Sequence, residues 1–172
     1  MDSDFLLIQK MKNGEEQAME SFVNQYYPKI LKYCCFHLPD TGDAEDITQE
    51  TFEQFFRSLN QYRHYGKALN YLYVIASNQC KNYYGKRREF AVGELPDQLD
   101  CSMKDLPGWI DLKAALNTLP PEFKETAILF FFQQMKQKEI AKILGIGLPL
   151  VKYRVKRAKE LLASNLGKEE LL

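Results

Sequence analysis

Apolar side chains recur at helical spacing, every three or four residues, through almost the whole of this 172-residue chain. No segment shows the sustained alternation of apolar and polar residues that a half-buried β-strand requires, and no internal repeat is present. We expect an all-α fold, with a first helix after Ser3 or Asp4 and further helices over about residues 15–37, 43–60, 67–84, 109–116, 121–134, 138–144 and 148–164.

One stretch lacks this periodicity. Between about residues 90 and 107 the chain holds Gly93, Pro96 and Pro107 among scattered acidic residues, a composition typical of a connecting segment. The sequence therefore predicts two small helical domains, residues 1–90 and 110–172, joined by an acidic linker over residues 91–109.

The overall charge is zero, with 23 Lys and Arg against 23 Asp and Glu. Taken alone, this balance argues against nucleic-acid binding, which is dominated by excess basic residues. Charge is nevertheless sorted into blocks, with nets of −6 over residues 1–60, +5 over 61–90, −4 over 91–111 and +5 over 112–172. Because the Debye length is only about 8–10 Å, a partner experiences each block rather than the total.

The start of the chain is acidic and has no signal-peptide pattern, and its longest strongly apolar run, residues 127–132, is too short to span a membrane. The four cysteines include no C-x-x-C pair. We therefore expect a cytoplasmic protein without direct membrane insertion, in which Cys34 and Cys35 pack as small apolar groups. We expect no metal site, since zinc ligands usually come in paired spacings, and no cofactor.

A helix-turn-helix pattern closes the chain. A short helix with Ile140, Ala141 and Leu144 on one face precedes Gly145, and a longer helix follows. In that longer helix one stripe is apolar, consisting of Val151, Val155, Ala158 and Leu162. A basic stripe lies about 100° away around the axis, with Lys152, Lys156 and Lys159 flanked by Tyr153 and Arg157. This helix suits a DNA major groove; the alternative is a solvated basic face on a structural helix.

Residues 61–90 combine six of the ten tyrosines with several basic side chains. Aromatic rings interleaved with cations suit unpaired bases, because a ring can stack on any base while Lys and Arg hold the backbone. The alternative is that tyrosines such as Tyr71 and Tyr73 are ordinary core residues.

An acidic helix is predicted between Asp43 and Phe56. Its apolar face consists of Ala44, Thr48, Phe52, Phe55 and Leu59, and a carboxylate row of Asp46, Glu50 and Glu53 lies opposite. Such a row repels DNA and suits a basic protein surface. Catalytic or di-metal carboxylates would need inward-facing partners from other helices, so we expect no enzymatic activity.

These stretches, in this order, resemble the extracytoplasmic-function sigma factors of bacterial RNA polymerase. The resemblance is carried by Asp43-Ala-Glu-Asp-Ile-Thr-Gln-Glu-Thr-Phe, by Tyr71-Leu-Tyr-Val-Ile-Ala-Ser-Asn-Gln-Cys-Lys-Asn-Tyr, and by Leu119-Pro-Pro with Lys138-Glu-Ile-Ala-Lys-Ile-Leu-Gly-Ile and Val151-Lys-Tyr-Arg-Val-Lys-Arg-Ala-Lys. It extends from about Asp4 to Leu162.

The resemblance implies three sets of contact residues. Core polymerase would be bound by Asp46, Gln49, Glu50 and Glu53. A base flipped from the downstream promoter element would be captured at a helix-interrupting loop, and the melted strand held nearby, by Tyr71, Ser77, Asn78, Gln79, Lys81, Asn82, Lys86, Arg87 and Arg88. The upstream element would be bound by Lys152, Tyr153, Lys156, Arg157 and Lys159.

The implied function is a sigma factor that binds core RNA polymerase through its largest and second-largest subunits and directs promoter-specific initiation. It would recognise the upstream promoter element, melt the downstream element and be regulated by an anti-sigma factor.

Two positions depart from the family pattern, which usually has Trp at Tyr71 and a small polar pair at Pro149-Leu150. The competing classes are a conventional helix-turn-helix regulator, which binds duplex DNA without polymerase, and a helical enzyme or adaptor.

Overall fold

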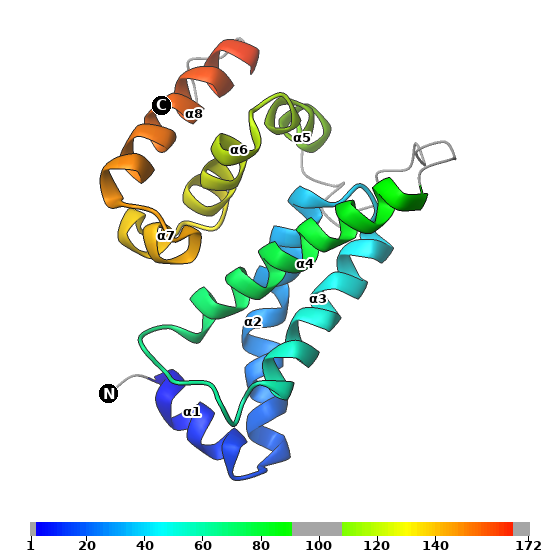
Figure 1. Ribbon diagram of the computed structural model, residues 1–172, viewed down its shortest axis with the longest axis vertical. Coiled ribbons are helices and arrows are strands. Elements are labelled where there is room, and N and C mark those ends of the chain that lie inside the picture. Colours follow the sequence, from blue (N-terminus) through cyan, green and yellow to red (C-terminus); the bar gives the residue numbers. More distant parts are fainter. Residues whose placement is uncertain (1–2, 91–107, 167–172) are drawn as a thin grey trace. The chain divides into compact units, whose positions relative to one another are not determined.

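The computed structural model of the chain describes residues 3–90 and 108–166, and for residues 87–90, 109–110 and 166 the backbone alone. Within these ranges every regular element is helical, and the helices form two compact units, α1–α4 and α5–α8 (Figure 1). The all-α, two-domain prediction is confirmed. The predicted acidic linker lies, except for its last two residues, outside the described residues.

The first unit is a bundle of α1 (Ser3–Lys12), α2 (Glu16–His37), α3 (Thr41–Arg57) and α4 (Ala68–Phe90). Helices α2, α3 and α4 pack against one another, and α1 packs against α2 (Figure 1). Aromatic rings fill the core between them. Phe22 of α2 stacks on Phe55 of α3 with ring centroids 4.8 Å apart, and Tyr33 of α2 meets Tyr73 of α4 at 5.3 Å.

A buried carboxylate of helix α1 forms hydrogen bonds with α2 and with the beginning of α4. Asp4 accepts hydrogen bonds from the hydroxyl of Tyr26 at 2.5 Å and from the backbone N–H of Ala68 at 3.2 Å. Lys12, at the other end of α1, donates to the carbonyl oxygen of Tyr62 at 2.8 Å. A carboxylate at the start of a helix also interacts favourably with its dipole, so these contacts fix where α4 begins.

Two predictions about helix boundaries were wrong. Helix α3 begins at Thr41 rather than Asp43, because the Asp40 side chain accepts the N–H of Gly42 at 2.7 Å and caps the helix two residues earlier. Helix α4 runs without interruption to Phe90, so no helix-interrupting loop exists at residues 77–79. That loop came from the family resemblance, and no Pro or Gly between residues 77 and 79 would break the helix.

The second unit consists of α5 (Trp109–Asn117), α6 (Pro121–Ala127), the π-helical turn η1 (Ile128–Phe132), α7 (Gln137–Leu144) and α8 (Leu148–Leu166). The turn η1 continues α6 directly, within the single helix predicted over residues 121–134. Helix α8 packs against α5, α6 and α7. Gly145 ends α7 in the left-handed conformation at φ 65°, which glycine adopts readily.

Burial inside this unit differs from prediction at α7. Ile140 is buried as expected, but Ile143 is the second buried residue, and Ala141 and Leu144 are only partly covered.

Lys113 of α5 is a buried charged residue of the same unit, at 4% exposure. Removal from water lowers the pKa of its ammonium group to about 8, and the nearby charge of Lys124 adds to the effect.

Cys34 and Cys80 are buried in the first unit, and neither forms a disulfide. Cys35 is equally buried but disulfide-bonded, which its position in the sequence does not predict, because spacing alone does not show which cysteines meet. Among the described helices, none combines the length and apolarity needed to cross a membrane.

Candidate functional surfaces

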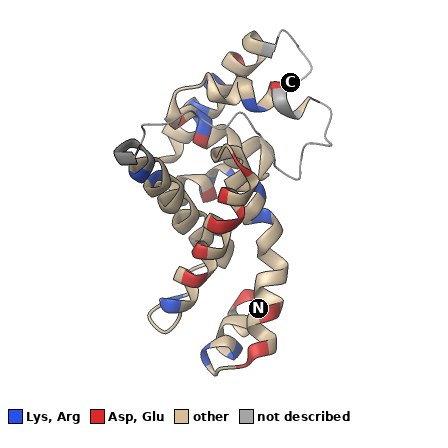
Figure 2. Cartoon of the chain, turned by 90° about the vertical axis from the view of Figure 1, so that its right-hand side faces the viewer, with Lys and Arg blue, Asp and Glu red and all other residues tan. Residues whose placement is uncertain are grey.

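Helix α3 presents an acidic outer face. Ala44, Thr48, Phe52, Phe55 and Leu59 are all buried, as predicted for its inner face. The four residues predicted to bind polymerase are all exposed on α3, and they are Asp46, Gln49, Glu50 and Glu53. Figure 2 shows the acidic positions following this helix along its outer side. The geometry therefore leaves these side chains accessible to a partner.

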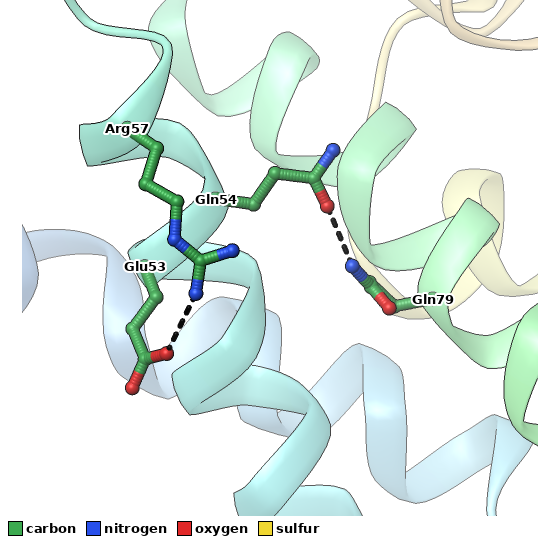
Figure 3. Close-up of polar contacts among 4 residues, drawn as sticks. All are labelled: Glu53, Gln54, Arg57 and Gln79. Atoms are coloured by element: carbon green, nitrogen blue, oxygen red, sulfur yellow. Dashed lines mark hydrogen bonds and ion pairs between the residues drawn. The ribbon is translucent and has the colours of Figure 1, made fainter.

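The acidic row is partly neutralised at one end. Arg57 forms an ion pair with Glu53 one turn earlier, at 3.3 Å, and both side chains are more than half exposed (Figure 3). Exposed pairs of this kind contribute little to stability and exchange partners readily. The rest of the row is formed by Asp46 and Glu50, with the Gln49 amide beside them.

On α4 the polar residues predicted to contact DNA form a stripe. Asn78, Asn82 and Lys86 are exposed and follow one another at steps of four residues, and exposed Lys81 lies three residues after Asn78, so the four lie on one side of the helix. Ser77 does not belong to this face, because it is buried at 7% exposure. Arg87 and Arg88 continue the helix backbone, and their side chains lie outside what the structure describes.

Gln79 lies at the edge of this stripe and faces α3. Its side-chain N–H donates a 2.5 Å hydrogen bond to the side-chain oxygen of Gln54, as Figure 3 shows. Gln54 was not among the site residues predicted from the sequence. Its position next to Glu53, on the exposed side of the predicted helix, could have indicated that it contributes to this surface. A second side-chain link joins the same helices, because the hydroxyl of Tyr83 donates to Asp43 at 2.6 Å.

Half of the six tyrosines in residues 61–90 pack in or against the core, namely Tyr62, Tyr71 and Tyr73. Tyr73 is buried, and burial raises the pKa of its phenol. Tyr71 is half-buried, stacked on Tyr62 with centroids 5.1 Å apart and tilted against Phe55 at 5.9 Å. The alternative interpretation of Tyr71 and Tyr73 as core residues therefore fits their surroundings.

Two other tyrosines of this segment, Tyr65 and Tyr84, are exposed, at 80% and 42%. The hydroxyl of Tyr84 donates to the backbone carbonyl of His37, so its ring is held against α2. Tyr65 lies in the connection before α4 and is the most exposed large aromatic side chain in the described part of the chain. The most exposed tyrosine ring of this segment therefore lies outside helix α4.

The helix-turn-helix presents a basic outer face on α8. Val151, Val155, Ala158 and Leu162 are all buried, which confirms the predicted apolar stripe. Lys152, Lys156 and Arg157 are exposed on the other side, and Lys159 is half-buried. Arg157 forms an exposed ion pair with Glu160 at 3.1 Å. Helix orientation thus follows from the apolar stripe, and it directs the cations outward.

Two exposed apolar side chains stand among these cations. Tyr153 is 57% exposed and packs edge-on against Phe123 of α6, with ring centroids 6.2 Å apart. Leu150, in the first turn of α8, is 40% exposed and was not among the predicted site residues. Its position one turn before Tyr153, on the outward face of the predicted helix, could have indicated that it belongs to this surface.

The described residues contain no group of three or more His, Cys, Asp or Glu side chains arranged to hold a metal ion.

Comparison with known proteins matches both units. Residues 22–90 match the family model of Sigma-70 region 2, and residues 110–162 match that of Sigma-70, region 4. The curated protein ECF RNA polymerase sigma factor SigE of Mycolicibacterium smegmatis is 30% identical over 168 residues, which cover 90% of this chain and 65% of that protein. The chain thus spans about two thirds of SigE.

A second relative matches over nearly its whole length. RNA polymerase sigma factor SigV of Bacillus subtilis is 27% identical, with 94% of this chain and 99% of SigV covered. Among solved structures, the sigma factor RpoE of Bartonella quintana, crystallised with the anti-sigma factor NepR, shares the fold with a TM-score of 0.76 at 21% identity. That match covers 87% of this chain and 97% of RpoE.

Proposed function

The chain belongs to the sigma-70 family, among the extracytoplasmic-function sigma factors of RNA polymerase, and we propose that its three exposed surfaces divide the work of promoter-specific initiation between them. The acidic face of α3 binds core polymerase, the polar stripe of α4 holds melted promoter DNA, and the basic face of α8 binds the upstream element. The observation that carries this proposal is that these three faces are exposed on the helices that the two sigma-70 regions cover.

The α3 face docks through charge. Asp46 and Glu50 are exposed carboxylates, flanked by Gln49 and by the Glu53–Arg57 pair. Complementary charge steers association and fixes register, so a basic surface of the largest polymerase subunit is the partner that this face suits. Contacts with the second-largest subunit complete the docking.

The α4 stripe holds a single strand. Amide groups of Asn78 and Asn82 can donate to and accept from base edges, whereas Lys81 and Lys86 bind the sugar–phosphate backbone. Because α4 is continuous, a base leaving the duplex meets a helix surface rather than a loop. The Gln54–Gln79 and Asp43–Tyr83 hydrogen bonds fix this surface relative to the docking face of α3.

The α8 face enters the major groove upstream. Lys152, Tyr153, Lys156, Arg157 and Lys159 lie on or beside the outward face, where cations reach phosphates on either side of the groove. Each DNA contact is weak by itself. Once polymerase holds both units, the second contact becomes intramolecular and gains affinity through effective concentration. This arrangement is compatible with a chain whose net charge is zero.

The chain acts by binding, and the bond chemistry of transcription belongs to the polymerase. Its place of action is the cytoplasm, where polymerase and promoter DNA meet. Because RpoE, which shares this fold, was crystallised with the anti-sigma factor NepR, we include an anti-sigma factor among the partners of this chain.

Core dependence of DNA binding tests this proposal. Purified chain, core polymerase and promoter DNA are combined in pairs and together, and complexes are separated by gel filtration. We expect the chain to co-elute with core polymerase, and specific DNA binding to require both proteins. Tight, specific binding of duplex DNA by the chain alone, as a dimer on a palindrome, would instead identify a conventional helix-turn-helix regulator.

A further inference from the structure

The first two turns of α8 expose an apolar pair on the face proposed to enter DNA. Leu150 is 40% exposed and Tyr153 is 57% exposed, and they lie three residues apart on the same side of the helix. Val151 and Val155 are buried against the rest of the unit, at 0% and 7%. The burial of these valines fixes the rotation of α8, so Leu150 and Tyr153 cannot turn inward.

Cations lie beside this pair and one turn after it. Lys152 is exposed beside Tyr153, and Lys156 and Arg157 follow Tyr153 one turn later. Tyr153 is also braced, since its ring packs edge-on against Phe123 of α6. With these cations on phosphates, the first turns of α8, which carry Leu150 and Tyr153, would lie over base edges rather than over the backbone.

The chemistry of Leu150 restricts what it can recognise there. Its side chain has no hydrogen-bond donor or acceptor, so it cannot read the nitrogen and oxygen atoms of base edges. The major groove offers one apolar feature, the C5-methyl group of thymine. Burying a methyl group between two apolar side chains removes it from water, which is the favourable part of such a contact.

We propose that Leu150 and Tyr153 form an apolar pair that recognises thymine methyl groups in the upstream promoter element, and that Leu150 is a specificity-determining residue of this chain. The inference rests on the proposed function, because it takes α8 to lie in the major groove. It adds the chemical group that is read there and the residue that reads it.

Deoxyuridine provides the test, because it differs from thymidine only by lacking the C5-methyl group. A promoter is first isolated by selection with the holoenzyme formed from the full chain and core polymerase. Each thymine of its upstream element is then replaced singly by deoxyuridine, and holoenzyme binding is measured. At one or two positions we expect affinity to fall about fourfold, the factor that corresponds to one buried methyl group at about 0.8 kcal/mol.

The Leu150→Ala variant links the effect to the residue. It should bind the thymine promoter several-fold more weakly than the wild type and should no longer distinguish thymine from deoxyuridine at the sensitive position. Leu6→Ala is the matched control, since Leu6 is a 50% exposed leucine on α1, and it should keep the full methyl sensitivity. Circular dichroism verifies that both variants are folded.

Three outcomes would overturn the proposal. Wild-type holoenzyme could bind every deoxyuridine promoter as tightly as the parent, the methyl effect could persist in full in Leu150→Ala, or Leu150→Ala could weaken binding of core polymerase instead. Failure of the proposed function would look different, because the holoenzyme would then not bind or select a promoter.

Discussion

The side-chain amide of Gln79 donates a 2.5 Å hydrogen bond to Gln54, joining helix α3, which carries the acidic row, to helix α4, which carries the polar stripe. Gln79 is thereby engaged with α3, while its neighbour Asn78 remains exposed. The relationship separates two roles that adjacent amides on one helix can have. Gln79 links the two helices, and Asn78 is the residue that we propose to contact DNA.

Replacing Asn78 by alanine should therefore impair promoter opening. Asn78 is exposed, so we expect stability to change by no more than about 0.5 kcal/mol. Losing an amide that contacts an unpaired base should reduce open-complex formation about tenfold while upstream binding is retained. Permanganate footprinting measures melted thymines, and Asn24→Ala, an exposed asparagine of α2, is the control. Equal loss of melting and of upstream binding would count against the assignment.

Charge reversal at Glu50 should prevent docking on core polymerase. Glu50→Lys places a cation in the middle of the acidic row, next to the basic surface that the row is proposed to meet. We expect co-elution with core polymerase to be lost while the helical circular dichroism spectrum stays unchanged. Glu20→Lys makes the same charge change at an exposed position of α2 and should co-elute normally. A Glu50→Lys complex as stable as the wild type would place the docking face elsewhere.

The salt dependence of DNA binding should show whether Lys156 contacts a phosphate. A lysine that neutralises one phosphate contributes about one unit to the slope of log affinity against log salt concentration. For holoenzyme carrying Lys156→Ala, filter-binding titrations should give a slope shallower by about one. Lys29→Ala, an exposed lysine of α2, should leave the slope unaltered. If the Lys156→Ala slope equals that of the wild type, Lys156 does not contact phosphate.

Buried Lys113 makes the stability of the second unit depend on pH. Its pKa is about 8 in the folded chain against 10.5 ordinarily, so the folded state binds fewer protons than the unfolded state between those values. The free energy of unfolding should therefore rise with pH across this interval. Lys113→Met should be more stable than the wild type at pH 7, by at most about 3 kcal/mol, with a smaller difference at pH 9.5.

Urea titrations of the full chain at the two pH values measure this difference. Lys142→Met, which changes an exposed lysine of α7, controls for the general effect of removing a charge. A Lys113→Met variant whose advantage is the same at both pH values, or which is less stable at both, would contradict the account of Lys113.

Sequence periodicity predicted the faces of long amphipathic helices well. In α8, Val151 and Val155 are buried and Lys152 and Lys156 are exposed, because a helix of 19 residues with one apolar stripe can pack in only one orientation. For the short helix α7, the same reasoning predicted that Leu144 would lie on the buried face, whereas the residue that is buried is Ile143. Eight residues span barely two turns, so neighbouring helices decide which of two adjacent apolar positions is covered.

Contacts between residues far apart in the sequence could not be predicted from the sequence. Tyr83 reaches Asp43 across 40 residues and Gln79 reaches Gln54 across 25, and no local pattern encodes such pairs. The tyrosine-rich segment shows the same limit, because composition cannot distinguish a ring that stacks in the core, such as Tyr71, from an exposed ring such as Tyr65.

Transcription reconstituted from purified components tests the central claim most directly. Core polymerase, nucleotides and a library of DNA fragments are incubated with and without the full chain, and the 5′ ends of transcripts are mapped. The account predicts a restricted set of start sites that appears only when the chain is present and disappears with Glu50→Lys. Random initiation that the chain does not alter, with the chain bound to duplex DNA on its own, would contradict it.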